Sequence, residues 1–289
     1  MSTKDWKALY PYTGKYLDVD GGRLHYLDEG DKDGAVLLAL HGNPTWSFYW
    51  RALIEEFPNH RVIIPDHIGC GLSDKPQEWG YRLAQHVANV QALVDHLELK
   101  DINLMVHDWG GAIGMGLATA DPGRIQRLIV TNTAAFLSPH IPTTIAMCRI
   151  PILGPLMVRG GNAFAWVATW RATYKGLSKD VKKGLLFPYN SWSSRIATHR
   201  FVLDIPMKAG HPSYGTLQGI EERLPLLKDK PMVLLWGDDD FCFSPIFRKK
   251  WMELFPDAAV HAWKDVGHYV MEDARERVIP IVREFLEQG

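Results

Sequence analysis

Residues 104–116, LMVHDWGGAIGMG, decide the fold of this chain. An apolar run leads into a turn that carries Asp108, and a glycine-rich helical pattern follows directly. A strand that meets a helix across one sharp turn presents the residue at the turn at the carboxyl end of a sheet. Hydrolases with this pattern often have a serine at the turn, whereas this chain has a carboxylate. Asp108 is therefore either a nucleophile or, in the alternative interpretation, a cap for the helix that follows.

Short apolar runs that are typical of buried strands recur on both sides of this turn, and helical patterns lie between several of them. This order predicts a mostly parallel sheet with helices on both faces. The segments KYLDVDGG and RLHYLDEG, on either side of a glycine turn, predict a hairpin before the sheet. Strands are expected at residues 35–42, 61–66, 102–108, 128–133, 232–237 and 258–263, and helices at 81–99, 109–120 and 274–288.

The alternation of strands and helices stops between about Phe136 and Leu224. This part of the chain is helix-like, is rich in Trp and Met, and has no clear buried strand. We therefore predict a core formed by residues 1–136 and 225–289, and an inserted helical cap, residues 137–224, over the strand ends. Candidates to line an apolar pocket under the cap are Met157, Phe164, Trp166, Trp170 and Trp192.

Charge, cysteine content and hydropathy limit the classes of protein to consider. The formal net charge of −1 gives no electrostatic reason for nucleic acid or an anionic membrane as a partner. Three widely separated cysteines indicate a reducing compartment without disulfides or metal-ligand spacing. The chain has neither the apolar run of a signal peptide nor a transmembrane span. We expect a soluble cytoplasmic protein that uses no metal and no cofactor.

A histidine and an acid with suitable positions follow the turn in the sequence. His268 comes after the last expected strand, and the order nucleophile, acid, histidine is that of the α/β-hydrolase fold. In WGDDDFCF the spacing favours Asp240 as the acid, with Asp238 and Asp239 as turn residues. Asp239 remains an alternative because loop boundaries are uncertain by a few residues. The other place for an acid, after LIVTN, holds Asn132, whose amide cannot stabilise an imidazolium as a carboxylate does.

Two uncharged donors are candidates to bind an anion. HGNPTW (41–46) follows the strand from which this fold supplies a backbone N–H toward the nucleophile. Asn43 adds a side-chain amide, and Trp109 adds an indole N–H beside the nucleophile. The plainer alternative is that Asn43 forms the turn and Trp109 packs. Neutral donors beside a carboxylate nucleophile suit an anion that has to leave again.

A carboxylate nucleophile selects a particular chemistry. Asp108 would be ionised at neutral pH and would need no base to attack a saturated carbon. The product of that attack is an alkyl ester on the enzyme. Water activated by His268, which Asp240 orients, can then attack the carbonyl carbon of the ester. The residues therefore predict hydrolysis at an electrophilic sp3 carbon.

Five segments of the chain resemble haloalkane dehalogenases: HGNPTWSFYWR, PDHIGCGLSDKP, HDWGG, WGDDDFCF and VGHYVMED. The resemblance runs across nearly the whole chain and implies an α/β-hydrolase fold with a helical cap. It also implies Asp108 as nucleophile, His268 as base, Asp240 as acid, and Asn43 with Trp109 as halide ligands. The acid after the later strand and the Asn–Trp pair are similar to the third dehalogenase subfamily. The main expectation is a haloalkane dehalogenase, with a small apolar substrate and a halide ion as its partners.

Other functions remain open. VTNTAAF, SWSSRIATHRFVLDIP and GHYVMEDA are similar to the β-lactone decarboxylases of bacterial olefin biosynthesis, which share the same catalytic constellation. Epoxide hydrolases are a more distant alternative, for which Tyr174, Tyr189 and Tyr214 would be the activating tyrosines. In a non-enzymatic role, the cap segment IPILGPLMV (150–158) would form an apolar patch for homo-oligomerisation or for association with pathway enzymes.

Overall fold

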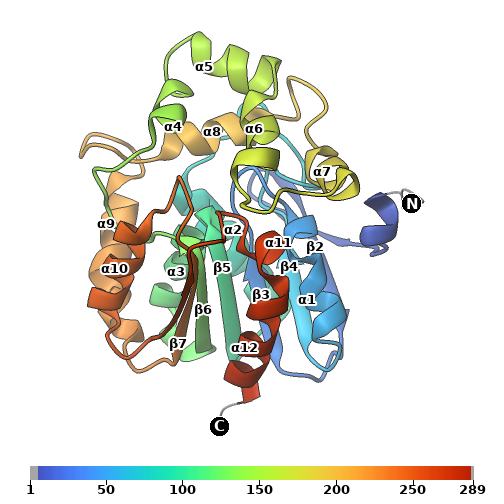
Figure 1. Ribbon diagram of the computed structural model, residues 1–289, viewed down its shortest axis with the longest axis vertical. Helices are drawn as coiled ribbons and strands as arrows, with labels where there is room; N and C mark the ends of the chain where they lie inside the picture. Colours follow the sequence, from blue (N-terminus) through green and yellow to red (C-terminus); the bar gives the residue numbers. More distant parts are fainter. Residues whose placement is uncertain (1–5, 288–289) are drawn as a thin grey trace.

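An eight-stranded sheet forms the centre of the computed structural model, which describes residues 6–287 (Figure 1). The strand order is β1-β2-β4-β3-β5-β6-β7-β8. β1 pairs antiparallel with β2, as the predicted hairpin requires, β2 pairs antiparallel with β4, and the other neighbouring pairs are parallel. The six other segments expected as strands are strands. The bounds are β1 (Lys15–Val19), β2 (Gly22–Gly30), β3 (Val36–Leu40), β4 (Arg61–Pro65), β5 (Ile102–Asp108), β6 (Ile125–Thr133), β7 (Met232–Gly237) and β8 (Ala259–Trp263).

Helices cover both faces of the sheet because the strand side chains alternate between two apolar clusters. In β3, Leu38 and Leu40 belong to the cluster under α2, α3, α9 and α10, whereas Leu37 and Ala39 belong to the cluster under α1, α11 and α12. The predicted α/β-hydrolase fold is confirmed. These helices are α1 (Arg51–Glu56), α2 (Leu83–His96), α3 (Trp109–Ala120), α9 (Tyr214–Arg223), α10 (Pro245–Leu254), α11 (Val270–Asp273) and α12 (Arg275–Glu287).

Between β6 and β7 the described chain forms only helices and loops. Most of these helices lie beyond the carboxyl end of the sheet, with α5 farthest from it (Figure 1). α9 instead packs against α3 beside the sheet. The division of the chain into a core and a cap of residues 137–224 stays a prediction. The helices over the sheet are α4 (Thr143–Met147), α5 (Leu153–Pro155), the π-helical turn η4 (Leu156–Gly160), α6 (Ala163–Arg171), α7 (Lys179–Leu186) and α8 (Ile196–Asp204).

Among residues 6–287, no helix combines the length and the apolar character that a membrane-crossing helix needs. The helices expected at 81–99 and 274–288 correspond to α2 and α12, whose observed ends differ by a few residues, and residue 288 lies outside the described residues. The helix expected at 109–120 is α3, with the same ends.

Candidate active site

Asp108 occupies a strained turn between β5 and α3. Its backbone has φ 51° and ψ −125°, in a region that residues other than glycine rarely adopt. The close approach of neighbouring backbone depends on glycine, because a Cβ at Gly42 would lie 2.1 Å from the Asp108 carboxylate and one at Gly110 would lie 2.2 Å from the Leu40 carbonyl oxygen. The Asp108 side chain makes no capping hydrogen bond to α3. The helix-cap interpretation is therefore wrong, and the buried carboxylate is available for another purpose.

Two backbone amides face the Asp108 carboxylate. The amide of Asn43 donates to Oδ1 at 2.6 Å. Burial raises the pKa of Asp108, while the charge of His268 and the amides of Asn43 and Trp109 oppose that rise. Amides from the β3 loop and from the residue after the turn are the donors that this fold uses for an oxyanion. They are placed to stabilise negative charge at the carboxylate or on an ester formed from it.

His268 lies between the two aspartates. Its Nδ1 is 2.8 Å from Asp240 Oδ2, and its Nε2 is 3.8 Å from Asp108 Oδ2. The second distance exceeds a hydrogen bond and leaves Nε2 free to face a water molecule or an ester on Asp108. Burial alone would lower the pKa of His268, but the charge and hydrogen bond of Asp240, together with the charge of Asp108, raise it above its ordinary value. The structure thus brings together the three residues expected to carry the chemistry.

Asn132 holds Asp240 in place, a role that the sequence analysis missed. The Asn132 amide nitrogen donates to Asp240 Oδ2 at 2.8 Å, and its oxygen accepts the Gly237 N–H at 2.8 Å. Asp240 Oδ1 accepts the Cys242 N–H at 2.6 Å. The sequence gives Asn132 only as an unsuitable replacement for the acid. Asn132 lies at the end of β6, next to β7, the strand that precedes Asp240. This position could have indicated that Asn132 holds the Asp240 carboxylate.

Asp240 and the neighbouring Asp239 give a matched test of the acid. Asp240 is buried and bonded to His268, whereas Asp239 is exposed. We expect Asp240→Asn to lower turnover by roughly 10³–10⁴-fold, because an amide neither fixes the same histidine tautomer nor stabilises an imidazolium. Asp239→Asn should keep nearly full activity. Steady-state kinetics of the two variants check this, and an equal loss in both would contradict the assignment.

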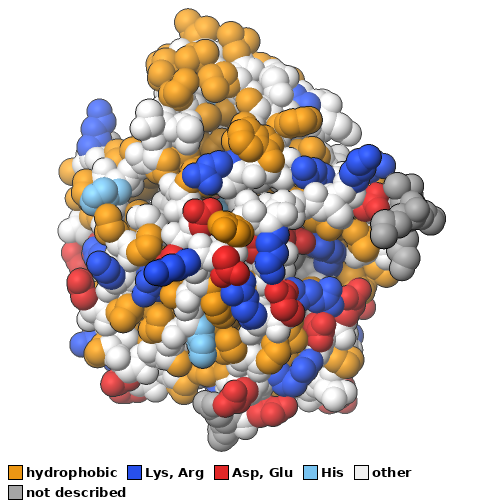
Figure 2. Space-filling model, viewed as in Figure 1, with side chains coloured by type: hydrophobic (Ala, Val, Ile, Leu, Met, Phe, Trp, Pro, Cys, Tyr) orange, Lys and Arg blue, Asp and Glu red, His pale blue; other side chains and the backbone are white. Residues whose placement is uncertain are grey.

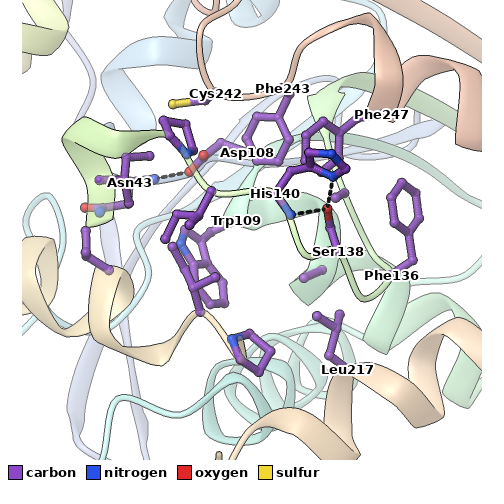
Figure 3. Close-up of a pocket in the computed structure, with 18 of the residues that line it drawn as sticks. Asn43, Asp108, Trp109, Phe136, Ser138, His140, Leu217, Cys242, Phe243 and Phe247 are labelled. Carbon is purple, nitrogen blue, oxygen red and sulfur yellow. Dashed lines mark hydrogen bonds between the residues drawn. The ribbon is translucent and has the colours of Figure 1, made fainter. Parts of the chain in front are cut away.

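Asn43 and Trp109 lie beside Asp108 at one end of a cavity (Figure 3). The Asn43 Nδ2 donates to the Thr198 carbonyl oxygen at 3.1 Å, which uses one of its two N–H groups. Within residues 6–287, no hydrogen bond engages the Trp109 indole N–H, and its ring packs against Phe201 at a centroid distance of 5.1 Å. In the described part of the chain, each side chain thus keeps an N–H that no protein group accepts. They remain candidates for binding an anion.

Two apolar cavities meet next to these residues. The first, about 130 Å³, is lined by Asp108 and Trp109 and extends toward Phe136, Leu217 and Phe247 (Figure 3). The second, about 200 Å³, is lined by His268 and Tyr269 and extends between α4 and α6. Four residues line both cavities: Asn43, Ile145, Phe164 and Cys242. The site therefore has two mainly apolar cavities with four lining residues in common, one lined by Asp108 and the other by His268.

The expected pocket lining is only partly correct. Phe164 and Met157 do line the cavities. Trp166, Trp170 and Trp192 line neither and are 59%, 54% and 46% exposed. These tryptophans were candidates for the pocket or for packing between cap and sheet, but α6 turns its alanines, among them Ala165 and Ala168, toward the core instead.

The three tyrosines considered for epoxide activation do not reach this site. Tyr189 is buried and donates its hydroxyl to the Thr45 carbonyl oxygen at 3.1 Å. Tyr174 and Tyr214 line neither cavity, and Tyr174 is 59% exposed. The epoxide hydrolase alternative therefore gains no support from these positions.

Comparison with known proteins gives relatives that cover almost the whole chain. Residues 35–274 match the family described as alpha/beta hydrolase fold. The cis-3-alkyl-4-alkyloxetan-2-one decarboxylase of Shewanella oneidensis is 42% identical over 97% of this chain and 90% of that protein. Haloalkane dehalogenase 2 of Mycobacterium tuberculosis is 30% identical over 96% of each chain. The crystal structure of the haloalkane dehalogenase DbeA from Bradyrhizobium elkani has a TM-score of 0.86 and 26% identity, and the similarity covers 95% of this chain and 97% of that one.

Proposed function

Because this chain belongs to the alpha/beta hydrolase fold family of enzymes, among relatives that include oxetanone decarboxylases and haloalkane dehalogenases, we propose that it decarboxylates cis-β-lactones with two alkyl arms. The higher identity, 42% against 30%, supports the decarboxylase alternative of the sequence analysis over its main expectation, the haloalkane dehalogenase. Asp108 is the proposed nucleophile, with His268 and Asp240 beside it.

The observation that carries this proposal is the pair of apolar cavities. A lactone with alkyl groups on two adjacent ring carbons has two chains that diverge from one polar ring. One cavity is lined by Asp108 and the other by His268, the two share four lining residues, and each is lined mainly by apolar side chains, so each can take one alkyl chain. A linear haloalkane needs only one such branch. The polar ring would lie at the junction, next to Asn43.

The first proposed step opens the ring. An Asp108 carboxylate oxygen attacks the saturated ring carbon that bears the lactone oxygen, and the bond between that carbon and the ring oxygen breaks. Its electron pair leaves with the ring oxygen, which becomes part of a free carboxylate. The side-chain N–H groups of Asn43 and Trp109 are available to bind this new anion. The product is an alkyl ester on Asp108 that carries a carboxylate on the adjacent carbon.

The second step releases the products without water. The bond to the carboxylate breaks, its electrons form the carbon–carbon double bond, and the ester oxygen leaves as the regenerated Asp108 carboxylate. Carbon dioxide and an olefin result, and no oxidant or cofactor is required. Inversion in the first step and anti elimination in the second together turn a cis-lactone into a cis-olefin. Protonated His268, stabilised by Asp240, would favour the departure of the Asp108 carboxylate.

Haloalkane hydrolysis is the second candidate function. It is supported by the Trp109 indole N–H, which faces the same cavity as Asp108 and suits a halide. In this reaction the ester on Asp108 has no neighbouring carboxylate, so it can be cleared only by water. Neutral His268 would then act as the base. Halide binding by Asn43 and Trp109 belongs to this candidate.

A comparison of products from two substrates tests the proposal. We expect a long-armed cis-β-lactone to give olefin and carbon dioxide, and 1-bromobutane to be turned over more slowly or not at all. A single turnover in H₂¹⁸O adds an independent readout, because ester hydrolysis introduces ¹⁸O into the Asp108 carboxylate whereas elimination does not. Mass spectrometry of the peptide that contains Asp108 measures the label. A lactone turnover that yields a β-hydroxy acid and labelled Asp108 would contradict the proposed elimination.

The two reactions should also differ in their dependence on pH. The pKa of His268 is raised above its ordinary value by Asp240 and Asp108, against the effect of burial. Hydrolysis needs neutral His268, so alcohol formation should fall as the pH decreases through this raised pKa. Elimination tolerates the imidazolium, so olefin formation should persist to lower pH. Profiles of kcat against pH for olefin and for alcohol formation check this. If both rates fall at the same pH on the acid side, His268 does not have different roles in the two reactions.

The cellular setting stays a prediction. The expected cytoplasmic location, the absence of a cofactor, and association with copies of itself or with pathway enzymes through the cap all rest on the sequence analysis. A small apolar substrate is the partner that the relatives support.

A further inference from the structure

The helices over the sheet carry a group of exposed apolar side chains on one short segment. We call it the cap patch: Met147, Ile150, Ile152, Leu153 and Leu156. Ile152 is 78% exposed and Leu156 57% exposed. Hydrophobic side chains gather over α5 and α6 at the end of the molecule farthest from the C-terminus (Figure 2). Exposed aromatic side chains of α6, Trp166 and Trp170, add to this apolar surface. A contiguous apolar surface of this kind marks a site of interaction.

Ile152 is held outward by a strained turn. Its φ is 67° and its ψ −54°, and the Leu153 N–H donates to the Pro151 carbonyl oxygen at 2.8 Å across it. This is the rare form of the three-residue γ-turn, which is unfavourable for a β-branched side chain. The strain gives the folded chain no burial in return, because Ile152 is the most exposed large apolar residue among those described. A binding partner would give this conformation a function.

The helical segment that carries the cap patch has a net positive charge. Residues 137–204 contain nine Lys and Arg but only two Asp and Glu, whereas the rest of the chain has 23 and 31. The net charge of −1 for the whole chain does not show this difference in charge between the two parts of the chain. The expectation that an anionic membrane has no electrostatic attraction for the protein rests on the net charge alone. Figure 2 shows Lys and Arg side chains below the apolar end of the molecule.

Most of this positive charge is not neutralised within the protein. Arg149 donates to the carbonyl oxygens of Val202 and Ile205, and Arg195 donates to carbonyl oxygens only. Arg159 donates to a carbonyl oxygen and to the amide oxygen of Gln77. Among the nine basic side chains, Lys175 alone has an ion pair within residues 6–287. The surface therefore keeps a field that attracts anions.

We propose that the cap patch docks onto an anionic lipid surface. Apolar side chains enter the boundary between headgroups and acyl chains, and the surrounding Lys and Arg face the negative headgroups. Exposed tryptophans are favoured at that boundary because the ring is apolar and its N–H remains hydrated. Binding to a protein partner without a strong negative charge would account for the exposed apolar side chains. It would not account for the net positive charge of residues 137–204. The helices above the two cavities would thereby face the bilayer.

Vesicle flotation with the full chain tests the proposal. We expect binding to phosphatidylcholine vesicles that contain phosphatidylglycerol, weaker binding to pure phosphatidylcholine, and loss of the difference at high salt. Ile152→Asp with Leu156→Asp should lower the partition coefficient about tenfold or more, because two apolar contacts are lost. Neither residue lines a cavity, so turnover in solution should be unchanged.

A matched pair controls for added negative charge. Ile246 and Leu226 are 55% and 57% exposed and lie outside residues 137–204. Ile246→Asp with Leu226→Asp should leave vesicle binding close to that of the unchanged protein. Equal losses in both double variants, or no preference for phosphatidylglycerol in the unchanged chain, would overturn the proposal. Light scattering tests whether the cap patch binds a second copy of the chain instead. If the unchanged protein is a dimer that does not bind vesicles, and the Ile152/Leu156 double variant is a monomer, the cap patch is a dimer interface and the lipid proposal is wrong.

Discussion

Asp108→Ala is expected to abolish turnover of both β-lactones and haloalkanes, with a loss of roughly 10⁴-fold or more. The reason is that the proposed first step forms a covalent bond to this carboxylate. Within the described cluster, the other carboxylate, Asp240, is already engaged by His268, Asn132 and the Cys242 amide. Rates of olefin and halide release from the purified variant measure the loss.

The variant also needs a control for folding. Asp108 has a strained backbone with φ 51°, so alanine there keeps the strain and removes only the carboxylate. Circular dichroism and the melting temperature should remain close to those of the unchanged protein. A folded variant that retains more than a small fraction of its activity on either substrate would refute Asp108 as the nucleophile.

His268→Phe is expected to separate the two chemistries and to trap an intermediate. If the unchanged protein turns over 1-bromobutane, the variant should release one equivalent of bromide and gain the mass of a butyl group, because no base activates water to clear the ester. With a β-lactone, the adduct carries the whole lactone mass and should decay to olefin slowly, since elimination requires no water. Intact-protein mass spectrometry over time measures both adducts.

Two outcomes would count against this scheme. If the unchanged enzyme consumes a substrate but His268→Phe forms no adduct with it, covalent attack by Asp108 on that substrate is wrong. If the lactone adduct of His268→Phe persists indefinitely, His268 is required for elimination itself and not only for its rate. A conservative control is Tyr269→Phe. Tyr269 lines the second cavity next to His268, and phenylalanine there keeps the aromatic ring and removes only the hydroxyl group.

Much of the fold was predictable from the sequence because each buried strand is a short apolar run bounded by turn residues. β5 and β7 are buried along their whole length, and the bounds expected for both strands are the observed ones. The cap was less predictable. Its helices are short, and α6 buries alanines while it exposes tryptophans. Size and hydropathy therefore gave the wrong orientation for these aromatic side chains.

The catalytic residues were predictable because this fold places each of them at or just after the end of a particular strand. Asp108 ends β5, while Asp240 and His268 follow β7 and β8. Parallel strands end at one edge of the sheet, so the fold brings the three residues together. Asn132 was missed as a support because its function depends on an amide reaching across to the neighbouring strand, which no local pattern reveals. The two cavities were also unpredictable, since their branches are formed by residues far apart in the sequence.

The hydrogen bond between Asn132 and Asp240 has an evolutionary consequence. The ends of β6 and β7 are the two places where this fold can put its acid, and here one holds the amide and the other the carboxylate, 2.8 Å apart. The two side chains have nearly the same shape, but a carboxylate at position 132 could not donate to the Gly237 carbonyl oxygen as the Asn132 amide does at 2.9 Å. A lineage that moved its acid from one strand to the other would therefore have to satisfy that carbonyl oxygen in another way.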